Sequence, residues 1–228
     1  MNKKRISFLL LLIICSTLFS WMWFAPIFWE LSDGETDFWL AFQKVFFQSN
    51  KKEFFLGDTT DLQGTIWVFH SIDQIIQGNA TTILPQLYSP IGFDWGLNEG
   101  FAWLDAVLGW PYYKAIGTLG FYNFHVFVLL AGNAFFLTLM FSQTKIGFLP
   151  AFSLSMIALL HPFAQHEIFH GRPTQMHLWF QALFLLSIYK LLYEEAKIRW
   201  SIIGGLSLAG SCLVYWFGAA ALGFVGAI

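Results

Sequence analysis

Two carboxylates, Asp58 and Asp61, lie three residues apart in the stretch 57–62, GDTTDL, and are the side chains best placed for chemistry. A carboxylate can accept the proton of an attacking hydroxyl, or it can ligate a divalent metal that stabilises a leaving phosphate. Apolar residues then recur at helical spacing over residues 62–77, which predicts an amphipathic helix directly after the pair. We therefore interpret Asp58 and Asp61 as candidate catalytic residues. In the alternative interpretation, the pair supplies a helix cap and a solvated neighbour.

A second candidate is the sequence His166-Glu167-Ile168-Phe169-His170, which matches the His-Glu-x-x-His pattern of zinc peptidases. On a helix, the two histidines lie one turn apart and can share a zinc ion, with Glu167 as general base. Gly171 and Pro173 follow directly and would disrupt a continuing helix. An intramembrane zinc metallopeptidase is thus one alternative, and an interfacial loop with polar side chains at the lipid headgroups is the other.

Arg172 is the third candidate, because it is the only Lys or Arg in the segment 161–176. The donor fork of a guanidinium matches the oxygens of a phosphate group. A lipid phosphate at the membrane face is therefore the ligand that we expect for it. The alternative is an interfacial arginine that extends its charged end toward water.

The chain that carries these residues has the composition of a membrane protein. It is 57% hydrophobic and 11% charged, whereas a soluble domain carries about 25% charged residues. The predicted fold class is all-α, a polytopic membrane helix bundle of about five transmembrane helices in a single membrane domain, 1–228. We predict spans at 6–28, 121–141, 146–161, 177–193 and from about 202 onward.

The domain organisation follows from these spans. Residues 1–28 form the first transmembrane anchor, 29–119 a long outer loop of membrane-lying amphipathic helices, and 120–228 the remaining spans. Because the sequence ends within apolar residues, we expect a chain truncated at the C-terminus. The net charge of −2 gives a nucleic-acid partner no electrostatic support.

Charge predicts the orientation. Residues 29–119 hold eleven Asp or Glu against four Lys, and most of the remaining Lys and Arg lie in the N-terminal segment and in the connections that follow the second and fourth spans. The connection 161–176 is expected to lie outside together with 29–119. The positive-inside rule places the N-terminus in the cytoplasm and 29–119 outside an inner (plasma) membrane that the chain crosses several times. The basic residues that this orientation places inside are Lys3, Lys4, Arg5, Lys145, Lys190, Lys197 and Arg199.

Three segments carry a resemblance to a known family: 56–62 (LGDTTDL), 88–92 (YSPIG) and 171–175 (GRPTQ). Together with an anchor span followed by a long outer loop, they resemble a bacterial branch of the GT-C superfamily of polytopic glycosyltransferases. The resemblance implies transfer of a sugar from a polyprenyl-phosphate donor in the lipid bilayer. It implies that Asp58 or Asp61 acts as base or helps to bind a divalent metal ion. We assign Arg172 and Gln175 of the third segment to phosphate binding.

The chain departs from this family in length, because such enzymes usually carry many more spans. A non-enzymatic membrane component or transporter is therefore a further alternative. Pairs of glycine-interrupted spans would favour a transporter, and only the fifth predicted span, with Gly204, Gly205 and Gly210, is rich in glycine.

Overall fold

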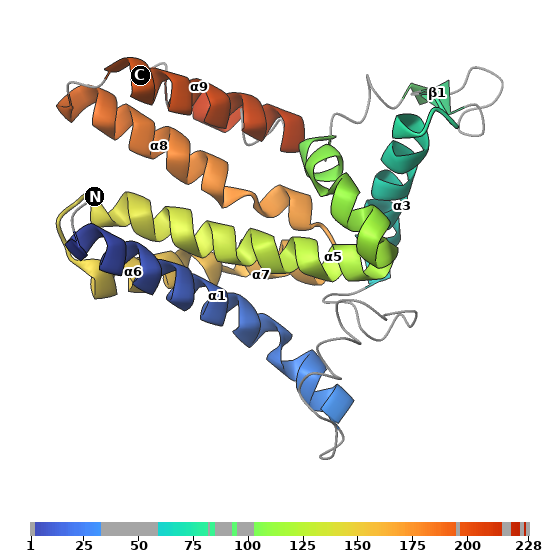
Figure 1. The fold of residues 1–228 in the computed structure, drawn as a ribbon, viewed down its shortest axis with the longest axis horizontal. Helices are drawn as coiled ribbons and strands as arrows, with labels where there is room; N and C mark the ends of the chain where they lie inside the picture. The colour runs from blue at the N-terminus through green and yellow to red at the C-terminus, as the bar shows by residue number, and fades with distance from the viewer. Residues whose placement is uncertain are drawn as a thin grey trace.

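The structure is a computed structural model that describes residues 3–32, 59–81, 83–84, 93–94, 103–194, 197–215, 220–223 and 226 (Figure 1). Its helices are α1 Lys3–Ser32, α3 Thr59–Ile76, α5 Trp103–Ser142, α6 Phe148–Leu159, α7 Pro162–Phe169, the 3-10 helix η2 Pro173–Met176, α8 Leu178–Tyr193 and α9 Lys197–Val214. A two-residue antiparallel pair, β1 Ile83–Leu84 with β2 Phe93–Asp94, is the strand structure within the described residues. The predicted helical class is confirmed.

Three helical segments are long and apolar enough to cross a membrane: Ile6–Ala25, Gly120–Ser142 and Pro173–Tyr193. The pair α6–α7, bent by 55° at its break, makes a fourth if it is one span. The fifth predicted span corresponds to α9, which is not among these segments. Lys197 and Arg199 lie in its first turn and lower its hydropathy. The described residues therefore support three or four spans and do not confirm about five.

The long helices run antiparallel to one another, so their connections gather at two ends of the molecule (Figure 1). The start of α1, the α5–α6 turn and the α8–α9 turn lie at one end. The helix α3 and the start of α5 lie at the other, which we call the α3 end. The connection between α7 and η2 also belongs to the α3 end, because the backbone N–H of Asp61 in α3 donates to the carbonyl of His170, at 3.2 Å.

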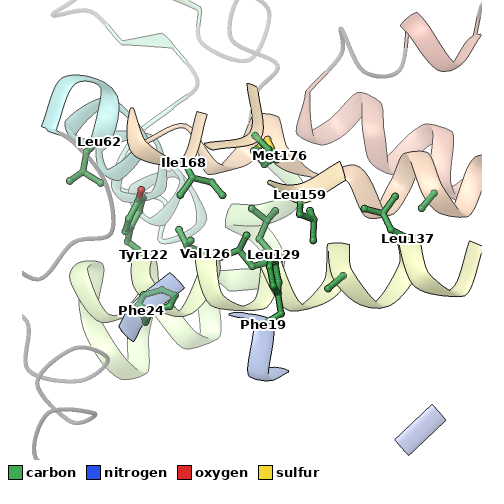
Figure 2. Packing of buried hydrophobic residues seen from close by; sticks show 14 residues of the cluster. Phe19, Phe24, Leu62, Tyr122, Val126, Leu129, Leu137, Leu159, Ile168 and Met176 are labelled. Carbon is green, nitrogen blue, oxygen red and sulfur yellow. The ribbon is translucent and has the colours of Figure 1, made fainter. Parts of the chain in front are cut away.

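The larger of two apolar core clusters joins most of these helices (Figure 2). It combines side chains of α1, α3, α5, α6, α7, η2 and α8. The buried members labelled in Figure 2 are Phe19, Phe24, Leu62, Tyr122, Val126, Leu129, Leu137, Leu159, Ile168 and Met176. Leu62 is 2% exposed, so the first turn of α3 packs into this core.

Hydrogen bonds between helices add specificity to the apolar packing. Thr138 of α5 donates to Ser155 of α6 at 2.9 Å. Asn133 of α5 donates through Nδ2 to the carbonyl of Met176 at 2.5 Å and accepts through Oδ1 from the backbone N–H of Trp179 at 2.9 Å. Small polar side chains of this kind join helices in an apolar medium, where unpaired backbone groups are costly.

The predicted amphipathic helix 62–77 is present as α3, Thr59–Ile76. It begins at Thr59, so Asp61 of the candidate pair lies in its first turn. Its apolar side chains Phe69 and Ile72 are buried against Phe121 of α5, and the rings of Phe69 and Phe121 lie 4.9 Å apart. Other helices thus cover most of the apolar face of α3, while Ile76 at its end is 41% exposed.

The helix α5 consists of two helical segments that meet at Gly117, whose φ of 75° and ψ of 174° are non-helical. A positive φ of this size suits glycine and strains other residues. The bend turns the first segment back along α3. As a result, residues of the predicted outer loop, from Trp103 onward, pack against residues of the predicted spans.

Candidate functional site

The first site lies where the start of α3 meets the connection between α7 and η2, and we call it the α3 corner. Beside the Asp61–His170 backbone bond, the hydroxyl of Thr65 donates to the carbonyl of Gly171 at 2.6 Å. Gly171 has a φ of +75°, and a Cβ at this position would lie 2.6 Å from the backbone nitrogen of Leu62. Only glycine permits both this conformation and this close approach.

The α3 corner brings Asp61 and Arg172 together, although 111 positions separate them. Arg172 Nε donates to Asp61 Oδ2 at 2.5 Å, and Arg172 Nη1 lies 3.6 Å from Glu167 Oε2. The side chains of Arg172 and Asp61 are 35% and 44% exposed, whereas that of Glu167 is 4% exposed. The hydrogen bond to Asp61 raises the pKa of the Arg172 guanidinium. Asp61 and Arg172 therefore form a partly exposed ion pair, and the buried carboxylate of Glu167 lies close to the same guanidinium.

The other residues of the predicted sites take different positions. Gln175 lies half-buried in η2, and its backbone N–H donates to the carbonyl of Arg172 at 3.2 Å. Asp58 lies outside the described residues. Asp61 and Arg172 are thus two candidates, far apart in sequence, whose charged side chains the described structure brings into contact.

The His-Glu-x-x-His stretch lies on α7, which ends at Phe169 with His170 as its C-cap. The rings of His166 and His170 stack with their centroids 3.9 Å apart. His166 Nδ1 lies 3.0 Å from Glu167 Oε1, and His170 Nδ1 donates to the carbonyl of His166 at 2.8 Å. Within the described residues, no third His, Cys, Asp or Glu completes a group of metal donors with these side chains. The zinc peptidase site stays a prediction.

A second cluster, which we call the α5 cluster, consists of Asp105, His125 and His177. Asp105 Oδ2 lies 2.8 Å from His177 Nε2 and 3.5 Å from His125 Nε2. The three side chains are 6%, 10% and 4% exposed in the order Asp105, His125, His177. Burial raises the pKa of Asp105, but the charges of His177 and His125 outweigh burial and hold this pKa below its ordinary value.

A cavity of about 230 Å³ opens onto the α5 cluster. Apart from the three cluster residues, apolar and aromatic side chains form most of its wall, among them Leu108, Phe124 and Trp179. An apolar wall around a few convergent polar groups is typical of small-molecule and cofactor sites.

Sequence reasoning did not single out Asp105. The signal was present, because this carboxylate falls inside an apolar stretch, and His125 falls inside a predicted span. Ionisable residues in such positions are expensive to bury and are usually paired. The bend at Gly117, which brings Asp105 close to the two histidines, could not be predicted from the sequence.

An ion pair between the buried Asp73 and the partly exposed Lys114 joins the other half of α3 to the first segment of α5. Asp73, which is 4% exposed, lies 3.0 Å from Lys114 Nζ and accepts hydrogen bonds from Trp110 Nε1 at 2.7 Å and Gln77 Nε2 at 2.6 Å. Burial raises the pKa of Asp73, but these donors outweigh it and hold the pKa below its ordinary value. This arrangement positions α3 against the first segment of α5.

Comparison with protein-family models, with curated proteins and with solved structures finds no match to this chain. The chemistry of the α3 corner and of the α5 cluster is therefore argued from their own geometry.

Proposed function

We propose that this chain is a membrane glycosyltransferase of GT-C type, which transfers a sugar from a polyprenyl-phosphate donor to a hydroxyl acceptor at the outer face of the membrane. The observation that carries the proposal is the ion pair between Asp61 and Arg172. A transferase of this kind needs a carboxylate to take the acceptor proton and a cation to hold the leaving phosphate. Both groups meet at the α3 corner, and both are partly exposed.

The exposed side of Arg172 is where the donor phosphate binds in this proposal. Its contacts with Asp61 and Glu167 involve Nε and Nη1, and a guanidinium carries five N–H donors in all. A phosphate on the exposed side competes with Asp61 for Arg172 Nε. The buried Glu167 keeps the guanidinium in place during this exchange, because it contacts a different nitrogen.

The exchange releases the Asp61 carboxylate for catalysis. The acceptor oxygen attacks the anomeric carbon of the sugar and forms the new glycosidic bond. The bond between that carbon and the phosphate oxygen breaks, and the lipid phosphate leaves with the electron pair. The acceptor proton passes to Asp61, and Arg172 neutralises the charge that develops on the phosphate.

The distribution of basic residues supports this assignment of sides. Lys145 lies in the α5–α6 turn, and Lys190, Lys197 and Arg199 lie around the α8–α9 turn, so these basic residues share the end opposite the α3 corner (Figure 1). We place that end in the cytoplasm by the positive-inside rule, and the α3 corner outside the inner membrane in a multi-pass protein.

Transfer of a radiolabelled sugar from its polyprenyl phosphate, by the purified chain in lipid nanodiscs, tests the proposal. We expect Asp61→Asn to reduce turnover by about 10²–10⁴-fold, which is the usual loss when a general base is removed. The matched control is Glu194→Gln, since Glu194 is also a carboxylate paired with a cation, Lys190, but lies at the opposite end. Turnover of Asp61→Asn at the parent rate would show that the aspartate is structural.

A further inference from the structure

We propose that Asp105, His125 and His177 form a binding site for one divalent transition-metal ion of the zinc type. The site is distinct from the α3 corner and from the His-Glu-x-x-His stretch. It stands independently of the proposed glycosyl transfer, because it rests on a different set of residues.

The ligand types fit such an ion. Two imidazoles and one carboxylate are a common donor set for zinc and for related first-row metals, whereas magnesium and calcium prefer an all-oxygen set. Both histidines present the same nitrogen, Nε2, to one carboxylate oxygen of Asp105. The three groups thus converge on one point from two parts of α5 and from the residue that precedes α8.

The spacing is close to that of a metal centre. One ligand atom from each of the three residues lies within 4.8 Å of the other two. Bonds of about 2.0–2.1 Å in tetrahedral geometry hold ligand atoms roughly 3.3–3.5 Å apart. The Asp105–His125 separation of 3.5 Å already has this value, and the Asp105–His177 separation of 2.8 Å needs to open by roughly 0.5–0.7 Å.

An unpaired nitrogen provides the second observation. His125 Nε2 is buried, lies 3.5 Å from Asp105 Oδ2 and has no hydrogen-bond partner among the described residues. A buried polar atom without a partner costs about 1–3 kcal/mol. A metal ion between Asp105 and the two histidines would give this nitrogen a partner.

The cavity completes the site. Three protein ligands leave one tetrahedral position open, and the 230 Å³ cavity lies beside all three. It offers an entry path and room for a water or substrate atom as the fourth ligand. Its apolar wall excludes competing polar groups, which strengthens the interaction of the ion with the carboxylate.

Metal binding must displace the proton that His177 shares with Asp105. Without metal, the Nε2–H of His177 donates to Asp105. Metal binding at Nε2 displaces this proton, which moves to Nδ1 of the same ring or is released to solvent. The dication and one carboxylate leave a net charge of +1 at the centre.

Cobalt binding tests the inference. The chain is purified with an affinity tag that contains no histidine, stripped with a chelator and titrated with Co²⁺, which reports low-coordinate nitrogen and oxygen ligation by its visible absorption. We expect one Co²⁺ per chain, displaced by Zn²⁺, and a thermal midpoint that rises with metal concentration. His125→Gln and Asp105→Asn should each weaken binding by about 10-fold or more.

His166→Gln is the matched control and should bind Co²⁺ as the wild type does. Folded wild-type protein that binds no stoichiometric Co²⁺ overturns the inference without recourse to any variant. Binding that persists in His125→Gln and Asp105→Asn overturns it as well. Loss of binding in His166→Gln with retention in His125→Gln would move the metal to α7. None of these readouts depends on sugar transfer, so the outcome is separate from that of the glycosyltransferase proposal.

Discussion

Substitution of Gly171 by alanine should loosen the start of α3 without unfolding the bundle. Alanine in the left-handed region costs about 1–2 kcal/mol. The new Cβ would also lie 2.6–2.8 Å from the N, Cα and Cβ atoms of Leu62. Overpacking of this kind costs about 1–3 kcal/mol. The strain therefore amounts to roughly 2–5 kcal/mol.

The contacts that hold the start of α3 are of similar strength. Two hydrogen bonds, from Asp61 N–H and from Thr65 Oγ1, contribute about 0.5–1.5 kcal/mol each. Burial of Leu62 adds about 1.5–3 kcal/mol. The free energy of this strain is thus close to the free energy that these contacts contribute. A substantial fraction of Gly171→Ala molecules should therefore have the first turns of α3 detached from the bundle.

Hydrogen exchange measured by mass spectrometry checks this expectation. Amides of residues 61–66 should exchange faster in Gly171→Ala, while those in the second segment of α5 keep their protection. Gly64→Ala is the control on the same helix, because a Cβ there meets nothing within 4 Å and improves helix propensity by up to about 1 kcal/mol. Equal exchange of residues 61–66 in Gly171→Ala and in the wild type would refute the close docking of α3.

Two further predictions concern pH and topology. Because the folded-state pKa of Asp73 is lowered, its ion pair stabilises the protein above the ordinary value of 3.8, and this contribution is lost as the pH falls through the folded-state pKa. The thermal midpoint of the wild type should therefore fall between pH 5 and pH 3 more steeply than that of Asp73→Asn, and parallel curves would contradict this role. In a background where Cys15 and Cys212 are replaced by serine, Asn79→Cys should react with a membrane-impermeant thiol reagent in cells with a permeabilised outer envelope, and Lys145→Cys should not. The reverse pattern would invert the orientation.

Local patterns in the sequence predicted the parts of this structure that depend on local physics. The periodicity of residues 62–77 predicted α3, and Gly171 and Pro173 predicted the end of α7. Asp61 and Arg172 were each singled out for the chemistry of their side chains. Their contact was not predictable, because it depends on the positive φ of Gly171 and on the close approach of two backbones.

The α5 cluster was missed for a similar reason. Asp105 falls in a stretch that the sequence assigns to an outer loop, and His125 in a stretch that it assigns to a span. The bend at Gly117 folds one onto the other, and a single glycine in an apolar sequence does not specify the direction of such a bend. The predicted number of about five spans is not confirmed, since α9 is not among the segments that are long and apolar enough to cross a membrane, and a sharp bend that sequence hydropathy does not report separates α6 from α7.

Binding of the donor phosphate to Arg172 is the central claim, and native mass spectrometry of the chain released from nanodiscs measures it directly. Wild-type protein incubated with polyprenyl phosphate should retain one lipid phosphate per chain, and the unphosphorylated polyprenol should not be retained. Arg172→Gln should lose the lipid phosphate, with Arg199→Gln at the opposite end as control, because a hydrogen bond to a charged group contributes about 1.5–3 kcal/mol. Equal retention by Arg172→Gln and the wild type, or equal retention of polyprenol and polyprenyl phosphate, would contradict the assignment of the α3 corner to phosphate binding.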